Sequence, residues 1–144
     1  MHEVVRGRRG PKGRRSLVVA LTTVVGVWMA GPGMAAETVL GTWASPPDRK
    51  GQTGYVVIRN CGAAYCGRLE RAFSPEGEPI TTRAVGKMLL RDMQPVQTGA
   101  YQGQVYVPLI DKVVDAEMQL EGDRLSVRGC AGIICNSQVW TRVE

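Results

Sequence analysis

Short runs in which apolar and polar residues alternate dominate this chain from residue 39 onward. In the clearest run, residues 114–120, every second residue is apolar and the residues between are Asp, Glu and Gln. Successive side chains of a strand point to opposite faces, so this run predicts a strand with one buried face. Similar runs are separated by turn-forming residues. The pattern predicts strands at residues 39–44, 55–60, 66–73, 87–93, 101–107, 113–120, 125–129 and 139–143.

This succession of short strands predicts an all-β fold built as an antiparallel meander. A tight turn is expected at Gly122, and Gln94-Pro95 is expected to end the fourth strand. Closing the sheet into a small eight-stranded barrel would remove the exposed edges that invite aggregation. A two-sheet β-sandwich uses the same strands and is the alternative. The interior of an eight-stranded barrel is either filled by side chains or holds one small ligand.

Residues 1–35 have the three parts of a secretory signal peptide. A basic segment ends at Arg15, an uncharged apolar stretch with an expected signal-peptide helix follows, and small residues surround Ala35. We expect cleavage after Ala35, with Ala36 as the near alternative. A single β-barrel domain, residues 36–144, would then reach the periplasm.

Two features of the leader leave alternatives open. No charge interrupts residues 16–36, a length that would span a bilayer, so an uncleaved leader would anchor the protein in the inner membrane. Arg14-Arg15 also matches part of a twin-arginine export signal. The sequence therefore does not decide between general secretion and twin-arginine export.

Removing the leader changes the charge and the chemistry of the chain. The full sequence has 18 basic and 13 acidic side chains, and the leader takes six of the basic ones and one acidic one, which leaves twelve of each. Nucleic-acid binding needs a clustered basic face, which this balance does not support. The leader also takes His2, the one histidine of the chain, so the mature part has no histidine base or metal ligand.

Four cysteines in an exported domain are expected to form disulfides. Of the three possible connectivities we favour Cys61–Cys66 and Cys130–Cys135, because each pair brackets a short loop of mostly small residues. The alternative is a zinc site with four cysteine ligands, which an oxidising compartment disfavours. We expect no metal and no cofactor.

Five segments of the chain match patterns of known families: Gly41-Thr42-Trp43, Cys66-Gly67-Arg68-Leu69, Tyr101 to Tyr106 with Pro108, Val127 to Cys130 with Cys135, and Trp140-Thr141-Arg142. Together they resemble the uncharacterised exported bacterial family called domain of unknown function 2147, and the first of them resembles the Gly-x-Trp opening of lipocalin-like (calycin) barrels. One departure from the family pattern is at residues 111–116, where Gly-Lys and an aromatic would be expected. The resemblance implies a lipocalin-like barrel in an exported protein and supplies no chemistry.

The lipocalin-like resemblance implies a role for two of these residues. In such barrels an Arg from the last strands packs over the first Trp and closes one end, so Arg142 is expected to cover Trp43 as a structural contact rather than as a ligand anchor. Tyr101, Tyr106 and Trp140 are the candidate ligand-binding residues, since binding sites are apolar with a few polar tips. The competing interpretation is that they are ordinary aromatic core.

We therefore expect a non-catalytic periplasmic binding module for a small apolar or amphipathic ligand. The alternative is an envelope structural or interaction protein with a filled barrel, which would bind an envelope protein through its surface. Asp115 and Glu117 share a strand face at a spacing compatible with paired-carboxylate catalysis, but alternating acids are usually a solvated face, and we expect no enzyme. The protein is expected to be a monomer that contacts the membrane only through its leader.

Overall fold

The computed structural model of the protein describes Gly10, Gly13 and residues 37–143. Apart from those two glycines, the expected signal peptide, its cleavage position and the paired arginines lie outside the described residues. In the described part, no helix is long and apolar enough to cross a membrane.

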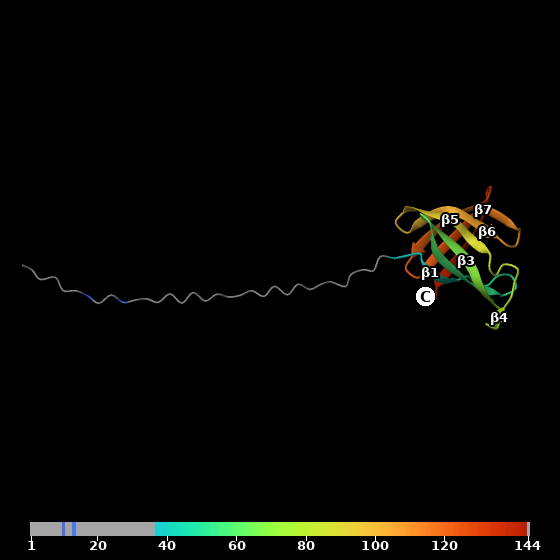
Figure 1. Ribbon diagram of the computed structural model, residues 1–144, viewed down its shortest axis with the longest axis horizontal. Helices are drawn as coiled ribbons and strands as arrows, with labels where there is room; N and C mark the ends of the chain where they lie inside the picture. Colours follow the sequence, from blue (N-terminus) through green and yellow to red (C-terminus); the bar gives the residue numbers. More distant parts are fainter. Residues whose placement is uncertain (1–9, 11–12, 14–36, 144) are drawn as a thin grey trace, which may run out of the picture. The chain divides into compact units, whose positions relative to one another are not determined.

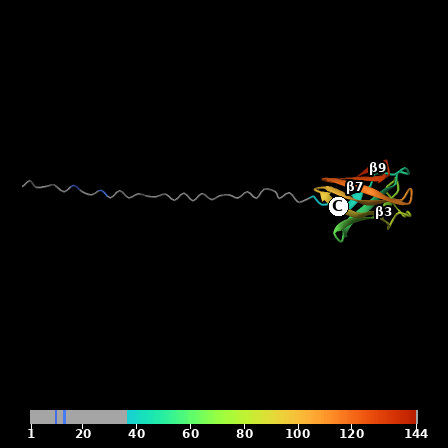
Figure 2. The same cartoon turned by 90° about the horizontal axis from the view of Figure 1, so that it is seen from above.

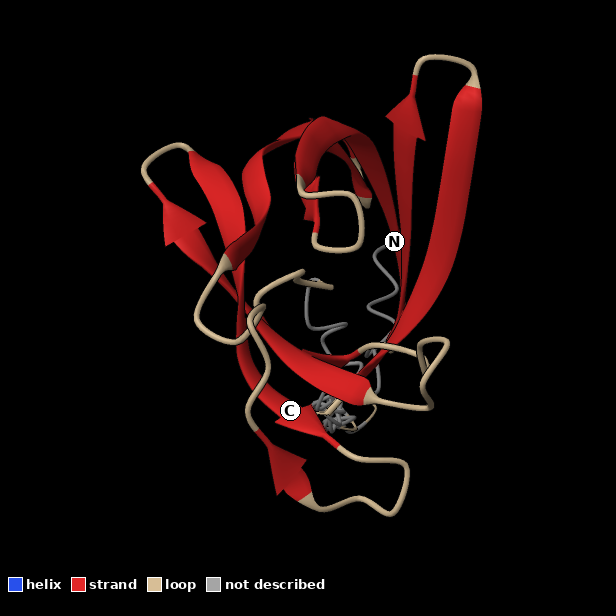
Figure 3. Ribbon diagram, turned by 90° about the vertical axis from the view of Figure 1, so that its right-hand side faces the viewer, coloured by secondary structure: helices blue, strands red, loops and turns tan. Residues whose placement is uncertain are grey.

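Residues 37–143 contain nine antiparallel strands joined by turns and loops, and eight of the strands form a closed barrel (Figures 1 and 2). The barrel order is β2-β1-β9-β8-β7-β6-β5-β3, and β3 returns to pair with β2. Figure 3 shows these strands surrounding a common interior. The expected barrel is confirmed, and the two-sheet sandwich is not formed. The strands are β1 (Gly41–Ala44), β2 (Thr53–Cys61), β3 (Ala64–Phe73), β4 (Pro79–Ile80), β5 (Met88–Gln97), β6 (Ala100–Val107), β7 (Lys112–Glu121), β8 (Arg124–Ala131) and β9 (Ile134–Arg142).

Most strand limits differ from the expected ones by one or two residues, and two differ by more. β5 runs past Pro95 to Gln97, because its pairing with β3 ends at Met93 and register shifts flank the proline on the β6 side. Proline is tolerated in strands where the ladder is interrupted in this way. β9 begins at Ile134 instead of residue 139, since a turn at Gly132 and Ile133 places Cys135 directly opposite Cys130. The sequence also gave no sign of β4, which extends the edge of β3 outside the barrel.

The alternation of β7 places its apolar side chains inside, as expected. Ala116, Met118 and Leu120 are buried, whereas the residues between them are exposed. Neighbouring strands add further buried side chains, and the largest fully buried ones are Trp43, Ile58, Leu90, Met93, Leu125, Val39 and Val56. These mainly aliphatic side chains fill the end of the barrel at which β1 begins.

Arg142 and Trp43 close that end of the barrel. The Arg142 guanidinium carbon lies 4.3 Å from the centre of the Trp43 ring, which is fully buried. Arg142 also donates hydrogen bonds to the carbonyl oxygens of Leu40 (3.0 Å) and Thr38 (2.6 Å) and forms an ion pair with Asp123. One side chain thus ties together the segment before β1, the end of β9 and the turn between β7 and β8.

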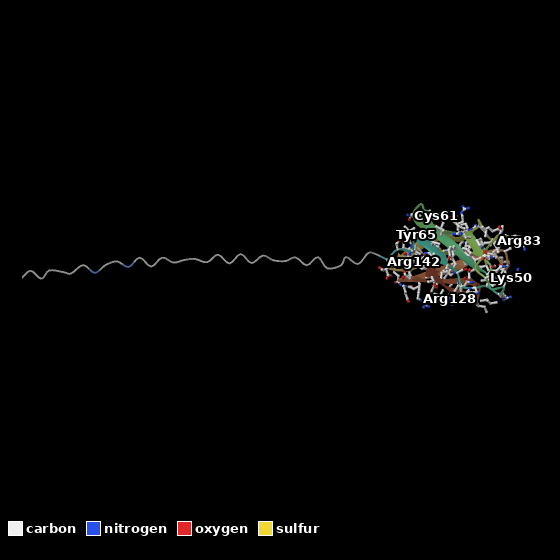
Figure 4. The ribbon with its side chains drawn as sticks, turned by 90° about the horizontal axis from the view of Figure 1, so that it is seen from below. Lys50, Cys61, Tyr65, Arg83, Arg128 and Arg142 are labelled. Atoms are coloured by element: carbon white, nitrogen blue, oxygen red, sulfur yellow. A yellow bond between two sulfur atoms is a disulfide. The ribbon has the colours of Figure 1, made fainter. Side chains whose placement is uncertain are left out.

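The two disulfides lie at opposite ends of the barrel. Cys61–Cys66 braces the β2–β3 turn, at the end that Arg142 closes, and Cys130–Cys135 braces the β8–β9 turn at the other end. Figure 4 shows Cys61, Tyr65 and Arg142 toward one end and Lys50 and Arg83 toward the other. Both expected pairings are formed, so the cysteines are not available as zinc ligands.

We predict that Trp43→Ala lowers the free energy of unfolding by about 3–5 kcal/mol, because it removes a fully buried indole and the surface on which Arg142 packs. Urea unfolding followed by circular dichroism measures the change. Trp43→Phe, with a smaller loss, gives a second value if the alanine variant does not fold. The matched control is Leu109→Ala, whose side chain is 74% exposed and should change stability by less than about 0.5 kcal/mol. Equal stability of the two alanine variants would contradict the closing role of Trp43.

Candidate functional site

The end of the barrel opposite Arg142 contains a hollow of about 160 Å³ between β5, β6, β8 and β9. Most of its wall is apolar, and Val105, Val127 and Trp140 reach it from the inward faces of their strands. The side-chain amides of Asn136 and Gln138 in β9 form a polar part of the wall. The residues that line the hollow are Leu89, Val105, Tyr106, Val107, Pro108, Val127, Gly129, Asn136, Gln138 and Trp140.

Trp140 is the buried base of this hollow on the β9 side. It is 4% exposed, and its indole N–H donates a hydrogen bond of 3.0 Å to the side-chain oxygen of Gln138. That bond satisfies the polar edge of the ring and holds Gln138 over it. Gly129 keeps the hollow open from β8, because a Cβ there would lie 2.9 Å from a methyl carbon of Val105.

Asn136 and Gln138 precede Trp140 at alternate positions of β9, so they lie on the same inward face. Both are nevertheless exposed. Side chains on the inward face of a complete barrel wall are covered. These two amides therefore mark a place where the wall beside β9 is incomplete. They give the apolar hollow a polar rim with hydrogen-bond donors and acceptors.

Tyr106 lies at the wall of the hollow, but its hydroxyl is engaged at the rim. The Lys87 ammonium donates a hydrogen bond of 3.0 Å to the Tyr106 hydroxyl, which in turn donates one of 2.7 Å to the Asp111 carboxylate. Lys87 also lies 5.0 Å from the centre of the Tyr106 ring. This chain of contacts joins the start of β5 to the β6–β7 turn and fixes the mouth of the hollow.

Tyr101 does not join the other two candidate ligand-binding residues. It is buried near the closed end, where its ring meets that of Tyr65 edge to face, with the centroids 5.5 Å apart. Burial, and secondly the neighbouring Tyr65, raises the pKa of Tyr101 above its ordinary value. The structure thus brings Tyr106 and Trp140 to one hollow and places Tyr101 in the core.

Asp115 and Glu117 are exposed on the outer face of β7. Glu117 lies beside Gln102 and Arg128 along a wider depression of about 420 Å³. Its lining mixes polar and apolar side chains of β5 to β9 and includes Tyr101. Within residues 37–143, no group of three His, Cys, Asp or Glu side chains is placed to hold a metal ion.

Sequence reasoning missed Asn136 and Gln138. The signal was available, because they alternate with Ser137 and Val139 and share the parity of Trp140. The last strand was predicted to begin at residue 139, so residues 136 and 138 lay outside any predicted alternation.

The chain belongs to the family described as uncharacterized protein conserved in bacteria (DUF2147), whose model matches residues 41–142. The matched span covers the whole barrel, from the first residue of β1 to the last of β9. No curated protein matches the chain in sequence.

Among solved structures, the barrel is similar to protein HP1028 from the human pathogen Helicobacter pylori, which is described as belonging to the lipocalin family. The TM-score is 0.58 at 12% sequence identity, and the match covers 74% of this chain and 84% of that chain. At this identity the likeness concerns the fold, and it confirms the expected lipocalin-like barrel.

We predict that Tyr101 ionises at a higher pH than a tyrosine free in solution, because its buried hydroxyl resists becoming charged. Its folded-state pKa lies above the unfolded value near 10, so its contribution to stability is fully present below about pH 10. That contribution is lost as the pH rises through the folded-state pKa. Phenolate absorbance near 295 nm measures the titration, and Tyr101→Phe should reduce the absorbance change that occurs above pH 10. An identical titration curve above pH 10 in this variant would contradict the assignment.

Proposed function

We propose that this protein is a non-catalytic binding module that holds one small apolar or amphipathic ligand at the open end of its barrel. The observation that supports this most is the hollow of about 160 Å³, which has apolar walls and the Asn136 and Gln138 amides at its rim. Binding sites for small molecules combine an apolar lining with a few placed polar groups in this way. The barrel fold is compatible with the role, but fold alone is not an argument for function.

The size of the hollow limits what the ligand inserts. An engineered cavity of about 150 Å³ holds one benzene molecule. The hollow therefore fits a single ring or the end of an aliphatic chain, with the rest of an amphipathic ligand lying outside at the amide rim. A larger ligand does not fit inside as a whole, because buried side chains occupy the remainder of the interior.

We also propose that the protein works in the periplasm. Disulfides persist in oxidising compartments, and this chain forms two of them. The basic and apolar leader supports the same location. An uncleaved leader would place the same barrel at the inner membrane.

The second candidate is an envelope structural or interaction protein without a ligand. It is favoured by the filled part of the core, where side chains of β2, β5 and β8 such as Ile58, Met93 and Leu125 are almost completely buried. The two functions differ in whether the hollow takes up a molecule.

We predict that fluorobenzene and hexanoate bind the mature protein saturably, and that Val107→Phe weakens both at least tenfold by occupying the mouth of the hollow. Fluorine NMR measures the first probe and isothermal titration calorimetry the second. The matched control is Val113→Phe, since Val113 is 41% exposed on the adjacent strand and does not line the hollow.

Native mass spectrometry of the protein purified from its own periplasm complements these titrations. A bound mass that is lost on denaturation, and absent from Val107→Phe, would identify the natural ligand. Equal binding of the probes to both phenylalanine variants, together with a bare native mass, would favour the filled-barrel protein instead.

A further inference from the structure

β9 is paired along its whole length on one side but only at its end on the other. Its ladder with β8 runs without a register shift from Ile134 to Thr141. On the opposite side its partner is β1, and the paired positions are Thr141 with Ala44 and Arg142 with Trp43. Among residues 37–143, no strand pairs with that side of β9 between Ile134 and Trp140. The β8–β9 hairpin, near the red end of the colour scale, extends beyond the barrel in Figure 1.

Two hydrogen bonds show which backbone groups the unpaired side presents. The Val143 N–H donates to the Thr42 carbonyl of β1, and the Arg142 N–H donates to the Asp123 carbonyl on the β8 side. Peptide groups alternate in direction along a strand, so odd-numbered residues of β9 face away from β8. The 4.1 Å between the Cα atoms of Cys130 and Cys135 agrees, because such short spacing marks a pair without mutual hydrogen bonds. Cys135, Ser137 and Val139 therefore direct their N–H and C=O groups to the unpaired edge.

Pro46 explains why β1 does not cover this edge. The register that pairs Ala44 with Thr141 would place residue 46 opposite Val139. The bond to Thr42 shows that even-numbered residues of β1 face β9, so residue 46 would have to donate to β9. Proline has no N–H, and Pro46-Pro47 turns the chain into the β1–β2 loop.

The exposed edge has none of the usual protection against strand addition. Natural edges carry charged residues, prolines or bulges. Residues 134–141 contain no charged residue and no proline, and their ladder has no bulge. Ile134 is 76% exposed and Val139 is 39% exposed. The Cys130–Cys135 disulfide holds this uncharged edge in extended conformation up to its tip.

We infer that this edge of β9 binds an extended peptide strand, and that an aliphatic side chain of the peptide enters the hollow. A strand added beside β9 places alternate side chains level with Asn136 and Gln138, on the face that lines the hollow. Backbone pairing at Cys135, Ser137 and Val139 supplies affinity, and the hollow selects the side chain. A hollow of about 160 Å³ matches one such side chain better than a typical small-molecule ligand, whose sites span roughly 300–1,000 Å³.

The same features argue against a second copy of this chain as the occupant. Pairing two β9 edges about a two-fold axis at Ser137 would place the amides of Asn136 and Gln138 opposite each other, and no apolar side chain would enter the hollow. The short unpaired edge would also bury far less than the roughly 1,200–2,000 Å² of a stable interface. The inference shares the hollow with the proposed function but does not require a small ligand.

The test uses the mature protein and the acetylated, amidated peptide Thr-Leu-Thr-Val-Thr, whose Leu and Val would face the hollow. Backbone amide exchange by NMR is the readout. We expect fast exchange at Cys135, Ser137 and Val139 in the free protein and at least tenfold slower exchange with peptide. Asn136 and Gln138, whose N–H groups pair with β8, should be protected in both states.

Ser137→Pro is the decisive variant, because it removes an N–H from the free edge and none from the β8–β9 ladder. It should weaken peptide binding at least tenfold, whereas Ser137→Thr should leave it unchanged. The peptide Thr-Ser-Thr-Ser-Thr should bind at least tenfold more weakly than the aliphatic one. Unchanged binding in Ser137→Pro, or no slowing of exchange at saturating peptide, would overturn the inference.

Two further outcomes would also overturn it. Protection of the three edge amides that grows with protein concentration, without peptide, would assign the edge to a second copy. Binding of fluorobenzene without binding of peptide would leave the proposed small-ligand function standing and remove the peptide.

Discussion

The contact between Arg142 and Trp43 is the constraint on which the barrel depends. It joins the last strand to the first, and closure of a sheet requires this one pairing between residues a hundred positions apart in sequence. The guanidinium covers a fully buried indole and satisfies two carbonyl groups of the entering chain at Thr38 and Leu40. A planar group with five donors serves all these partners at once, which an ammonium does not.

Closure is confined to one end, and the open end follows from it. β1 pairs with β9 only where Arg142 and Trp43 meet, and Pro46 then prevents the two strands from continuing together. The wall beside the first half of β9 is left incomplete, so Asn136 and Gln138 are exposed at the rim of an apolar hollow. The same proline thus limits a stabilising pairing and creates the surface that our functional proposals use.

Much of the fold was predictable because strand alternation is a local property. The period of two in β7 predicted which of its side chains are buried, and the spacing of the cysteines favoured the two disulfides that form. Prediction failed where long-range pairing decided the outcome. Pro95 stays inside β5 because β3 has already ended beside it, and the early start of β9 depends on its ladder with β8. Of the candidate ligand-binding residues, Tyr106 and Trp140 line the hollow and Tyr101 packs into the core.

The sequence by itself determined an all-β domain, its family resemblance and the alternation of its strands. These features depend on periodicity, composition and short motifs, which are properties of neighbouring residues. Only the tertiary structure decided where the barrel wall is incomplete and which side chains surround the hollow. The gap exists because β1 is shorter than β9, its partner. How far two strands pair depends on both of them, so the sequence of one does not show it. No local pattern in β9 records that β1 ends at Ala44, two residues before Pro46.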